Sequence, residues 1–468
     1  MIQRIISGFI VSLLLAVAPA QAKIVLPSIF SNNMVLQQKD NVPVWGRSTA
    51  NATVSVITSW NNKKYTARAD SEGTWSLKVS TPSAGGPFNI TISDGQKLTL
   101  TNILIGEVWV CSGQSNMEMP VKGFGNQPIL QSADILLEAD NPQIRLIRYE
   151  RELKRTPQFD AKSTSWQVSN AEVARDFSAA GFQFAQLLQR KLQVPVGIIM
   201  STWGGTRIEP WMPEKSLRAF PEIVVPAISD TAKIMRNDPS VLFNAMIHPF
   251  LSYGIKGVLW YQGEGNRFNS KIYDRLMAAM VQEWRSRWQR NFPFYYVQIA
   301  PFKYKDTIAT AAYLREAQLK ASTLIPNSGM VVSMDLGAEN SIHPPDKTTI
   351  AKRLACWALA NTYGWKGLPF AGPVYQSMTI NNGDVTLTFS NIENGLTTFG
   401  KTLSAFEVAA DDKVFYPATA RIAGKTVIVK CDQVKNPVAV RYAFKEWIEG
   451  DLFNTEGLPA SSFRTDNW

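Results

Sequence analysis

The stretch Gly106-Glu-Val-Trp-Val-Cys-Ser-Gly-Gln-Ser-Asn-Met-Glu-Met-Pro120 joins an unbroken apolar run to small and polar residues. Residues 108–110 predict a short strand covered on both faces, because a half-exposed strand would alternate apolar and polar residues. Gly113 permits a tight turn after this strand, and the residues after Ser115 can begin a helix whose free N–H groups face any negative charge nearby. Ser115 therefore stands where an acyl-transfer enzyme places its nucleophile.

The surroundings of Ser115 differ from the nucleophile elbow of α/β-hydrolases. That motif reads G-x-S-x-G, and Met117 occupies the place of its second glycine. A serine hydrolase of another architecture is therefore required. A single serine after a strand is by itself more often an ordinary turn residue, so the remaining catalytic groups have to come from elsewhere in the chain.

Composition and the first residues indicate an exported globular protein. The chain has 468 residues, of which 45% are hydrophobic and 18% charged, which is enough for more than one hydrophobic core. A short basic start, an apolar run over residues 5–17 and the cleavage pattern Ala20-Gln21-Ala22 predict a signal peptide over residues 1–22. We expect a mature chain from Lys23 and a periplasmic or secreted location. No later stretch approaches the roughly 20 apolar residues of a membrane span, so no membrane anchor is expected.

The net charge of +10 is spread along the chain rather than gathered in one segment. The longest basic runs are pairs such as Lys63-Lys64 and Lys154-Arg155. A nucleic-acid-binding stripe is therefore poorly supported, and no nucleic-acid partner is expected. A dispersed basic surface still favours anionic glycans through long-range attraction.

The cysteine pattern does not suggest a disulfide framework. Cys111, Cys356 and Cys431 allow one disulfide at most and require none. Cys111 lies inside the predicted buried strand, where a free thiol behaves as a small apolar residue. We therefore expect Cys111 to pack in the core.

The region 23–106 is rich in short strand-like segments separated by turn residues. A spacing of roughly 8 to 12 residues with alternating faces predicts an antiparallel β-sandwich. We find no histidine there, and no acid–base pair. The expected strands are 42–45, 52–57, 64–68, 73–78, 89–92 and 97–101.

The region 107–370 alternates apolar strands with amphipathic helices. This alternation predicts an α/β domain with a mostly parallel sheet and helices on both faces. The expected strands after residue 110 are 194–200, 257–261, 294–299 and 329–334, and the expected helices are 179–192, 273–288, 313–322 and 348–363.

The region 371–468 returns to strand-like segments. Asn381-Asn382-Gly383 is a hairpin turn signal within it. This β-rich region forms a second β module or completes the first, and the sequence leaves both possibilities open. Its expected strands are 378–380, 385–389, 405–408, 427–429 and 438–442.

Polar residues follow several strands of the expected parallel sheet. They are Ser115, the block Gly204-Gly205-Thr206-Arg207, the block Gln262-Gly263-Glu264-Gly265-Asn266 and the loop 335–343. Ligands of such sheets bind at the carboxyl ends of the strands, so these residues are expected to share one edge. Glycine backbone N–H groups and the Gln262 side chain there meet the needs of an oxyanion hole.

A serine nucleophile activated by imidazole has only two possible partners in this chain. His343 lies in a loop after a strand and before a helix, and Pro344 and Pro345 restrict its backbone. His248 lies in an apolar stretch, where a structural role is expected. His343 is therefore the candidate base.

Two other chemistries compete with acyl transfer. Asp335 and Glu339 are oxygen ligands suited to a hard cation, but the chain has no H-E-x-x-H motif, and no metal is expected. Glu264, Asp335 and Glu339 include possible carboxylate pairs for glycoside hydrolysis. That chemistry leaves Ser115 without a role.

Several ordered blocks span nearly the whole mature chain: Met34-Val-Leu-Gln-Gln38, Gly113-Gln-Ser-Asn-Met117, Trp203-Gly-Gly-Thr206, Leu242-Phe-Asn-Ala-Met246, Trp260-Tyr-Gln-Gly-Glu264 and Ile342-His-Pro344. In these blocks the chain resembles the sialate O-acetylesterase family, a branch of the SGNH (GDSL-like) serine esterases. The resemblance implies a flavodoxin-like three-layer catalytic domain with attached β modules. It makes Ser115 the nucleophile and His343 the base, and it places the oxyanion hole at the Ser115 N–H, the block with Gly204 and Gly205, and Gln262. It implies no metal and no cofactor.

The chain departs from this family's pattern beside the histidine. The family usually has an aspartate two or three residues before it, where this chain has Ser341 and Asn340. Either Glu339 or Asp335 orients the histidine, or a neutral acceptor such as a backbone carbonyl or the Asn340 side chain does so. The last arrangement would make the enzyme a Ser–His dyad.

Together, these features predict a secreted carbohydrate O-acetylesterase that acts on an O-acetylated glycan. The family resemblance points to sialate 9-O-acetyl esters. An acetylxylan or xyloglucan acetylesterase is the alternative enzyme, and a non-catalytic carbohydrate-binding protein is the alternative from another class.

Overall fold

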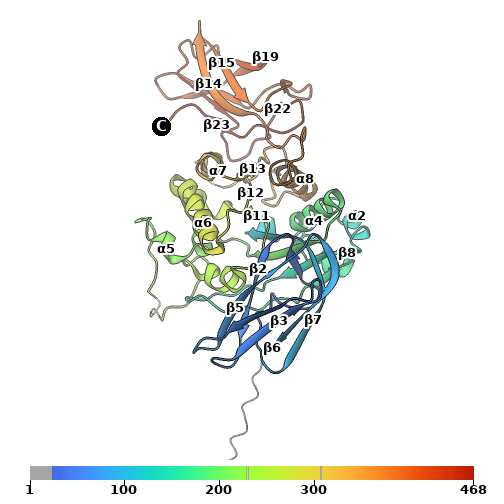
Figure 1. Cartoon of the computed structure of the whole chain (residues 1–468). Helices are drawn as coiled ribbons and strands as arrows, with labels where there is room; N and C mark the ends of the chain where they lie inside the picture. Colours follow the sequence, from blue (N-terminus) through green and yellow to red (C-terminus); the bar gives the residue numbers. More distant parts are fainter. Residues whose placement is uncertain (1–23, 228, 230, 306–307) are drawn as a thin grey trace, which may run out of the picture.

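One long strand, β7 (Lys97–Gly113), connects two sheets of the molecule. The computed structural model describes residues 24–227, 229, 231–305 and 308–468 (Figure 1). The first half of β7 pairs with β6 (Gly85–Ser93) in antiparallel and with β1 (Val35–Gln37) in parallel orientation. Its second half is the central strand of a larger parallel sheet. The expected strands 97–101 and 108–110 are therefore parts of one element.

The division into domains stays a prediction. A boundary after residue 106 falls inside β7, whose backbone hydrogen bonds continue from one sheet into the other. The predicted signal peptide, residues 1–22, lies outside the described residues. Across the described part of the chain, no helix has the length and apolar character needed to cross a membrane.

The large sheet has the strand order β13-β12-β11-β7-β10-β8-β9. Neighbouring strands from β13 to β8 are parallel, and β9 is antiparallel at the edge, so the sheet is mixed. The strand β7 comes first of these in the chain and lies between β10 and β11. The strands that follow it are therefore added on one side of β7 (β8, β9 and β10) and then on the other (β11, β12 and β13). The remaining strands are β8 (Asn141–Arg148), β9 (Gln167–Ser169), β10 (Val196–Thr202), β11 (Gly257–Tyr261), β12 (Phe294–Val297) and β13 (Ser328–Val331).

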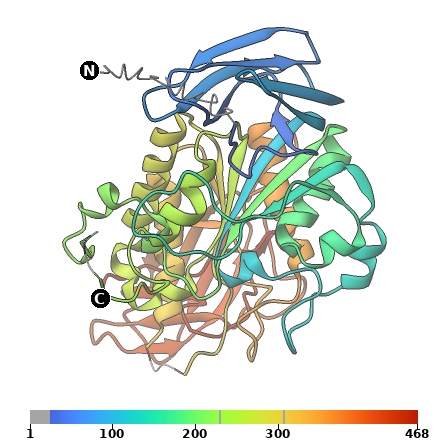
Figure 2. The ribbon, with the colours of Figure 1, turned by 90° about the horizontal axis from the view of Figure 1, so that it is seen from below.

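Alternate residues of β7 face opposite sides of this sheet, and helices cover both sides (Figure 2). Val108 and Val110 belong to one hydrophobic core together with residues of α6 and α7, whereas Trp109 and Cys111 belong to a second core with α4 and α8. The expected mostly parallel sheet with helices on both faces is confirmed, with the antiparallel β9 at its edge, as is the buried position of Cys111. The four helices are α4 (Ala179–Leu192), α6 (Tyr273–Trp288), α7 (Thr310–Leu324) and α8 (Lys347–Trp357).

The bounds of α4 and α6 agree with the expected helices 179–192 and 273–288. The helix α7 begins three residues before the expected 313–322, and α8 ends at Trp357, where a π-helical turn, η5 (Ala358–Thr362), continues it. The shorter helical elements are α1 (Ser115–Glu118), α2 (Ser132–Leu137), α3 (Ala171–Arg175), η1 (Glu209–Trp211), α5 (Glu214–Leu217), η2 (Phe243–Ile247), η3 (His248–Phe250) and η4 (Glu264–Ile272).

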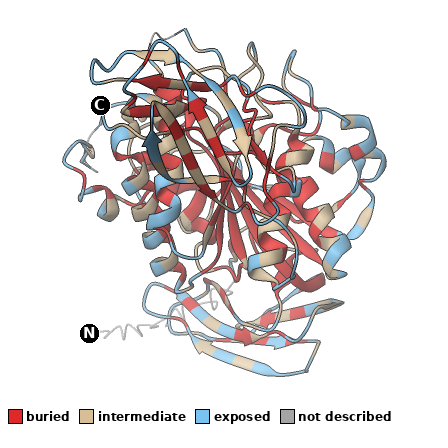
Figure 3. Ribbon diagram, turned by 90° about the horizontal axis from the view of Figure 1, so that it is seen from above, coloured by how far each residue is buried: buried red, intermediate tan, exposed pale blue. Residues whose placement is uncertain are grey.

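The N-terminal β region contains three antiparallel pairings besides those of β7. The strand β3 pairs with β4 and β6, and β2 pairs with β5. Burial alternates along β2 and β3, as expected for strands with one face on a core and one in water (Figure 3). The bounds are β2 (Asn41–Arg47), β3 (Thr53–Thr58), β4 (Lys64–Arg68) and β5 (Thr74–Ser80).

The C-terminal β region lies at the opposite end of the molecule from the N-terminal one (Figure 1). Its strands pair only with one another among the described residues, in the orders β14-β15-β20-β19, β18-β17-β21-β23 and β16-β22. It therefore forms sheets of its own and does not complete the first β region. Its strands are β14 (Val374–Asn381), β15 (Asp384–Ser390), β16 (Leu396–Thr397), β17 (Phe406–Ala409), β18 (Phe415–Pro417), β19 (Thr419–Ala423), β20 (Thr426–Lys430), β21 (Ala439–Tyr442), β22 (Phe453–Asn454) and β23 (Phe463–Arg464).

Candidate active site

Ser115 is the first residue of α1, directly after the central strand β7. Gly113 makes the turn between them with φ +133°, and a Cβ at this position would lie 2.3 Å from the carbonyl oxygen of Tyr261. Only glycine fits there. The turn keeps Ser115 partly exposed while its neighbours Gln114 and Asn116 are buried. The serine therefore lies at the carboxyl end of β7, the strand at which the strand order reverses. Such topological switch points are common ligand sites in α/β sheets.

His343 lies in the loop between β13 and α8 and reaches across to this serine. Its Nε2 is 2.8 Å from Ser115 Oγ. The loop is closed locally by Ser341, whose hydroxyl donates to the His343 carbonyl oxygen at 3.2 Å. The ring of Phe124 packs edge-on against the imidazole, with 5.3 Å between ring centroids. The structure thus brings together the two residues predicted as nucleophile and base, 228 positions apart in the sequence.

The other imidazole nitrogen is held by a residue that the sequence did not reveal. His343 Nδ1 is hydrogen-bonded to Gln127 Oε1. Because an amide oxygen is an acceptor only, Nδ1 carries the proton and Nε2 is left to accept one from Ser115. Gln127 lies in a short loop closed by backbone hydrogen bonds with Phe124. Apart from the missing aspartate near His343, no sequence signal marks this glutamine.

The two acids considered as orienting groups are engaged elsewhere. Asp335 accepts two hydrogen bonds from the Arg353 guanidinium, at 2.8 and 2.7 Å. Glu339 is paired with Lys303 Nζ at 2.8 Å. The partner of His343 Nδ1 is therefore the neutral amide of Gln127 and not a carboxylate. Within the described residues, no group of three or more His, Cys, Asp or Glu side chains is arranged to hold a metal ion.

Burial sets the protonation state of the histidine. Desolvation, and secondly the positive charge of Lys347, lower the pKa of His343 to about 4. The imidazole is therefore neutral at pH 7, as a proton acceptor must be. The second histidine, His248, has its Nδ1 2.8 Å from the carbonyl oxygen of Gln158 and lies in η3, in keeping with the expected structural role.

The glycine block after β10 packs against the nucleophile. A Cβ on Gly204 would lie 3.2 Å from the Cβ of Ser115, and the Gly204 N–H donates to Glu118 Oε2 at 2.8 Å. Gly205 has φ +70°. Among the described residues, the backbone N–H groups of Ser115 and Gly205 have no hydrogen-bond partner. Both N–H groups are therefore available as hydrogen-bond donors.

The Gln262 side chain, expected to donate to an oxyanion, has other partners. It is fully buried, and its Nε2 donates to the carbonyl oxygen of Thr206 at 3.1 Å and to Asn266 Oδ1 at 2.8 Å. Its Oε1 accepts from the Tyr273 hydroxyl at 2.8 Å. Both amide hydrogens are thus used, and the expectation of a side-chain donor at Gln262 is wrong for this arrangement. The residue instead fastens the loops after β10 and β11 to each other.

Glu264 contacts neither of the acids with which glycoside hydrolysis would pair it. Its Oε1 accepts from Asn116 Nδ2 at 2.6 Å, and Asn116 Oδ1 accepts from Lys347 Nζ at 2.7 Å. Asp335 and Glu339 have their own basic partners. The three carboxylates are therefore engaged separately.

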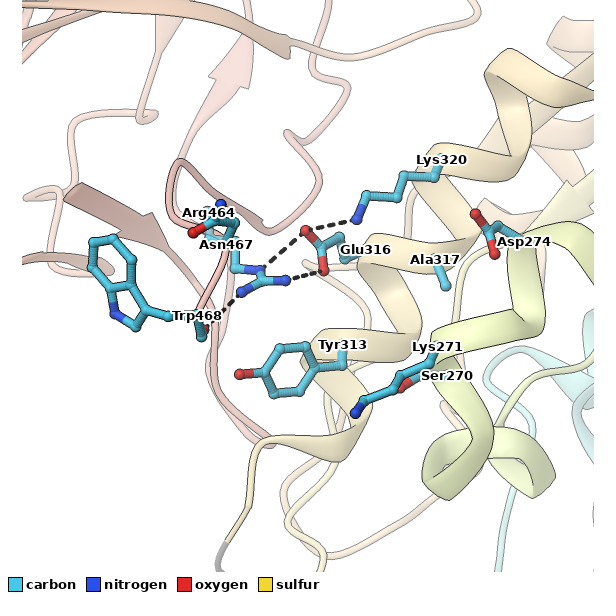
Figure 4. A pocket seen from close by; sticks show the side chains of 10 residues that line it. All are labelled: Ser270, Lys271, Asp274, Tyr313, Glu316, Ala317, Lys320, Arg464, Asn467 and Trp468. Atoms are coloured by element: carbon cyan, nitrogen blue, oxygen red, sulfur yellow. Dashed lines mark hydrogen bonds and ion pairs between the residues drawn. The ribbon is translucent and has the colours of Figure 1, made fainter. Parts of the chain in front are cut away.

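A cavity of about 470 Å³ lies away from this site, beside α7, the end of η4 and the C-terminus (Figure 4). Three of its side chains pair with one another, since Glu316 accepts from Arg464 Nε at 3.1 Å and lies 3.3 Å from Lys320 Nζ. None of the predicted site residues lines it.

Comparison with known proteins first defines a class of enzyme. The structure superimposes on a carbohydrate acetylesterase from Xanthomonas citri with a TM-score of 0.87, at 34% sequence identity, over 95% of this chain and 100% of that chain. This likeness and the clustered strand ends identify an α/β carbohydrate esterase of SGNH-like fold.

Sequence similarity then specifies the family. The chain is 33% identical to a sialate O-acetylesterase from Homo sapiens over 403 residues, which cover 77% of this chain and 76% of that protein. It is 31% identical to one from Pongo abelii over 466 residues, covering 90% and 87%. The family described as carbohydrate esterase, sialic acid-specific acetylesterase, matches residues 105–360. The chain belongs to this family.

Proposed function

We propose that this carbohydrate esterase hydrolyses acetyl esters of sugars through a covalent acyl-enzyme formed on Ser115, with His343 as the base. The observation that carries the proposal is the 2.8 Å contact between His343 Nε2 and Ser115 Oγ at the carboxyl end of β7. A serine hydroxyl is a weak nucleophile on its own, and a neutral imidazole at hydrogen-bond distance activates it.

In the first half of the reaction, Ser115 Oγ attacks the acetyl carbonyl carbon while His343 Nε2 takes the hydroxyl proton. The negative charge that develops on the carbonyl oxygen is stabilised by the N–H groups of Ser115 and Gly205. The imidazolium returns the proton to the sugar oxygen, which leaves as the alcohol. Water, activated by the same imidazole, then attacks the acetyl-enzyme and releases acetate.

The orienting group in this mechanism is neutral. Gln127 Oε1 accepts from Nδ1–H of His343 and holds the ring in the tautomer that faces Ser115. An amide oxygen stabilises the transient imidazolium by its dipole, without the full charge that a carboxylate supplies. The protein therefore works as a Ser–His dyad with a glutamine acceptor.

For the substrate we propose 9-O-acetylated sialic acid. The relatives in animals are named sialate O-acetylesterases. A cationic group also borders the site, since the guanidinium of exposed Arg236 lies over Gly205, with Nη2 3.2 Å from the position that a Cβ would take there. An arginine at this place suits the carboxylate of an acidic sugar. Acetylated xylan or xyloglucan, which lacks this carboxylate, is the competing substrate class.

Two further proposals concern the fold and the location. When the edge strands β8 and β9 are set aside, the order β10-β7-β11-β12-β13 corresponds to the order 2-1-3-4-5 of flavodoxin-like sheets, and we assign the α/β region to that three-layer type. We assign the two flanking β regions to a sandwich and a separate module. The basic, apolar and small-residue pattern of residues 1–22 supports export to the periplasm or the exterior.

Two assays test the function. Hydrolysis of p-nitrophenyl acetate by the wild type, lost in Ser115→Ala, distinguishes an esterase from a carbohydrate-binding protein. Acetate release from mucin sialic acids is then compared with release from acetylated xylan. We expect the sialic acid substrate to be preferred, and preference for xylan would contradict the substrate assignment while leaving the serine mechanism intact.

A further inference from the structure

A buried charged network lies directly behind the nucleophile. Lys347 Nζ donates to Asn116 Oδ1 at 2.7 Å, and Asn116 Nδ2 donates to Glu264 Oε1 at 2.6 Å. Lys347 is fully buried, and Glu264 is only 6% exposed. One neutral amide therefore stands between a buried cation and a buried anion, on the residue that follows Ser115.

Asn116 joins the segments that supply the reacting groups. It belongs to α1, beside Ser115, and its Nδ2 also donates to the carbonyl oxygen of Ile342 at 3.1 Å. Ile342 is the residue before His343. Glu264 begins η4, after β11, and Lys347 begins α8. A displacement of the Asn116 side chain would therefore change the position of Ser115 relative to His343.

The network is unfavourable as simple packing. Burial disfavours the charged forms of Lys347 and Glu264, and a cation in the first turn of a helix is opposed by the helix dipole. Glu264 Oε2 is also buried without a hydrogen-bond partner among the described residues. Apolar side chains of similar volume often replace such buried charges without loss of stability. Local rules are broken in this way mainly at functional sites.

We propose that Lys347, Asn116 and Glu264 act as a positioning network that holds Ser115 against His343. The proposal rests on the Ser115 and His343 roles given above. The three residues touch no reacting atom in this account and act through the nucleophile and the base.

The charges around Lys347 support this role. Glu264 lies across Asn116, Asp346 precedes Lys347 in the chain, and the ring centroid of Tyr261 is 5.3 Å from Nζ. Burial lowers the pKa of Lys347 to about 7, although the charges of Glu264 and Asp346 raise it. Below pH 7 the amine is therefore charged, and this charge is the second cause, after burial, that lowers the pKa of His343 to about 4.

The test compares Lys347→Met, the double variant Lys347→Met/Glu264→Gln, and the control Lys352→Met, which removes an exposed lysine from the same helix. Each is assayed for kcat, KM and the acid side of the pH profile with p-nitrophenyl acetate, and for its melting temperature. We expect Lys347→Met to lose about 10²-fold in kcat with little change in KM, as small misplacements of reacting groups do. The acid limb of its pH profile should move to higher pH, because the positive charge of Lys347 no longer lowers the pKa of His343.

The double variant separates positioning from folding. It lacks the unpaired buried carboxylate of the single variant, so its melting temperature should recover, while kcat stays low and the acid limb stays at higher pH. If kcat recovers together with the melting temperature, or if the acid limb moves in neither variant, the network is structural and the proposal is wrong. A wild-type-like Lys347→Met beside an inactive Ser115→Ala would overturn this inference alone, whereas an active Ser115→Ala would overturn the proposed function.

Discussion

The two histidines of this chain stand in similar local settings but differ in what they can do. Each is followed by proline, and each has its Nδ1 hydrogen-bonded to a neutral oxygen, Gln127 Oε1 for His343 and the Gln158 carbonyl for His248. Only the Nε2 of His343 meets a serine hydroxyl. The orientation of an imidazole by a neutral acceptor is therefore not what makes a base. The two histidines differ in position, because only His343 lies at the carboxyl ends of the parallel strands, beside Ser115.

The largest effect on kcat is expected when each histidine is replaced by alanine in a separate variant. His343→Ala removes the proton acceptor and should lower kcat by roughly 10³-fold or more, because the serine is then unactivated. His248→Ala should retain kcat within a few-fold. Steady-state hydrolysis of p-nitrophenyl acetate measures both. Equal losses of kcat in the two variants would contradict the different roles of His343 and His248.

A smaller effect is expected for the group that orients His343. Gln127→Ala frees Nδ1 and should lower kcat by about 10- to 100-fold, less than the loss of a charged triad acid. Asp335→Asn and Glu339→Gln should keep most of the wild-type kcat, since Arg353 and Lys303, and not His343, are their partners. A loss of roughly 10³-fold in either acid variant would identify that acid as the orienting group and contradict the dyad.

The pH profile extends the comparison to protonation. His343 must be unprotonated to accept the serine proton, and its pKa is lowered to about 4 by burial and by Lys347. kcat/KM should therefore fall only as the pH drops through about 4, rather than near the ordinary histidine value of about 6.5. The profile is measured with substrate well below KM. An acid limb centred near 6.5 would place His343 in a more exposed setting than the structure has.

The smallest catalytic effect is expected at Gln262. Gln262→Ala leaves the Thr206 carbonyl oxygen without its donor and removes one hydrogen bond each from Asn266 and the Tyr273 hydroxyl, which costs about 1–3 kcal/mol in stability. Thermal unfolding should report this loss, while kcat changes only a few-fold at temperatures where the variant is folded. A loss of about 10²-fold in kcat with normal stability would restore Gln262 as an oxyanion donor.

Much of the α/β region is predictable because its signals are local. The helices α4 and α6 follow from apolar residues at helical spacing, and β11 from an unbroken apolar run. The meeting of Ser115 with His343 follows from one general rule, that parallel strands end at the same edge. No detailed contact was needed for that step.

The parts that sequence reasoning missed depend on distant contacts. Gln127 meets His343 from 216 residues away, and nothing in its own loop distinguishes it from a surface glutamine. Gln262 was expected to face the substrate because it follows a strand, but Tyr273 and Asn266 bind its side chain within the protein. The strand β7 is longer than expected because its two halves belong to different sheets, which the apolar pattern of either half does not show.

The most direct test of the account is covalent labelling with a serine-directed organophosphonate, followed by peptide mapping. The reagent needs both the nucleophile and its base. We expect a single adduct on Ser115, formed at the normal rate in His248→Ala and much more slowly in His343→Ala. An adduct on another residue, or labelling of Ser115 that does not depend on His343, would contradict the Ser115–His343 mechanism.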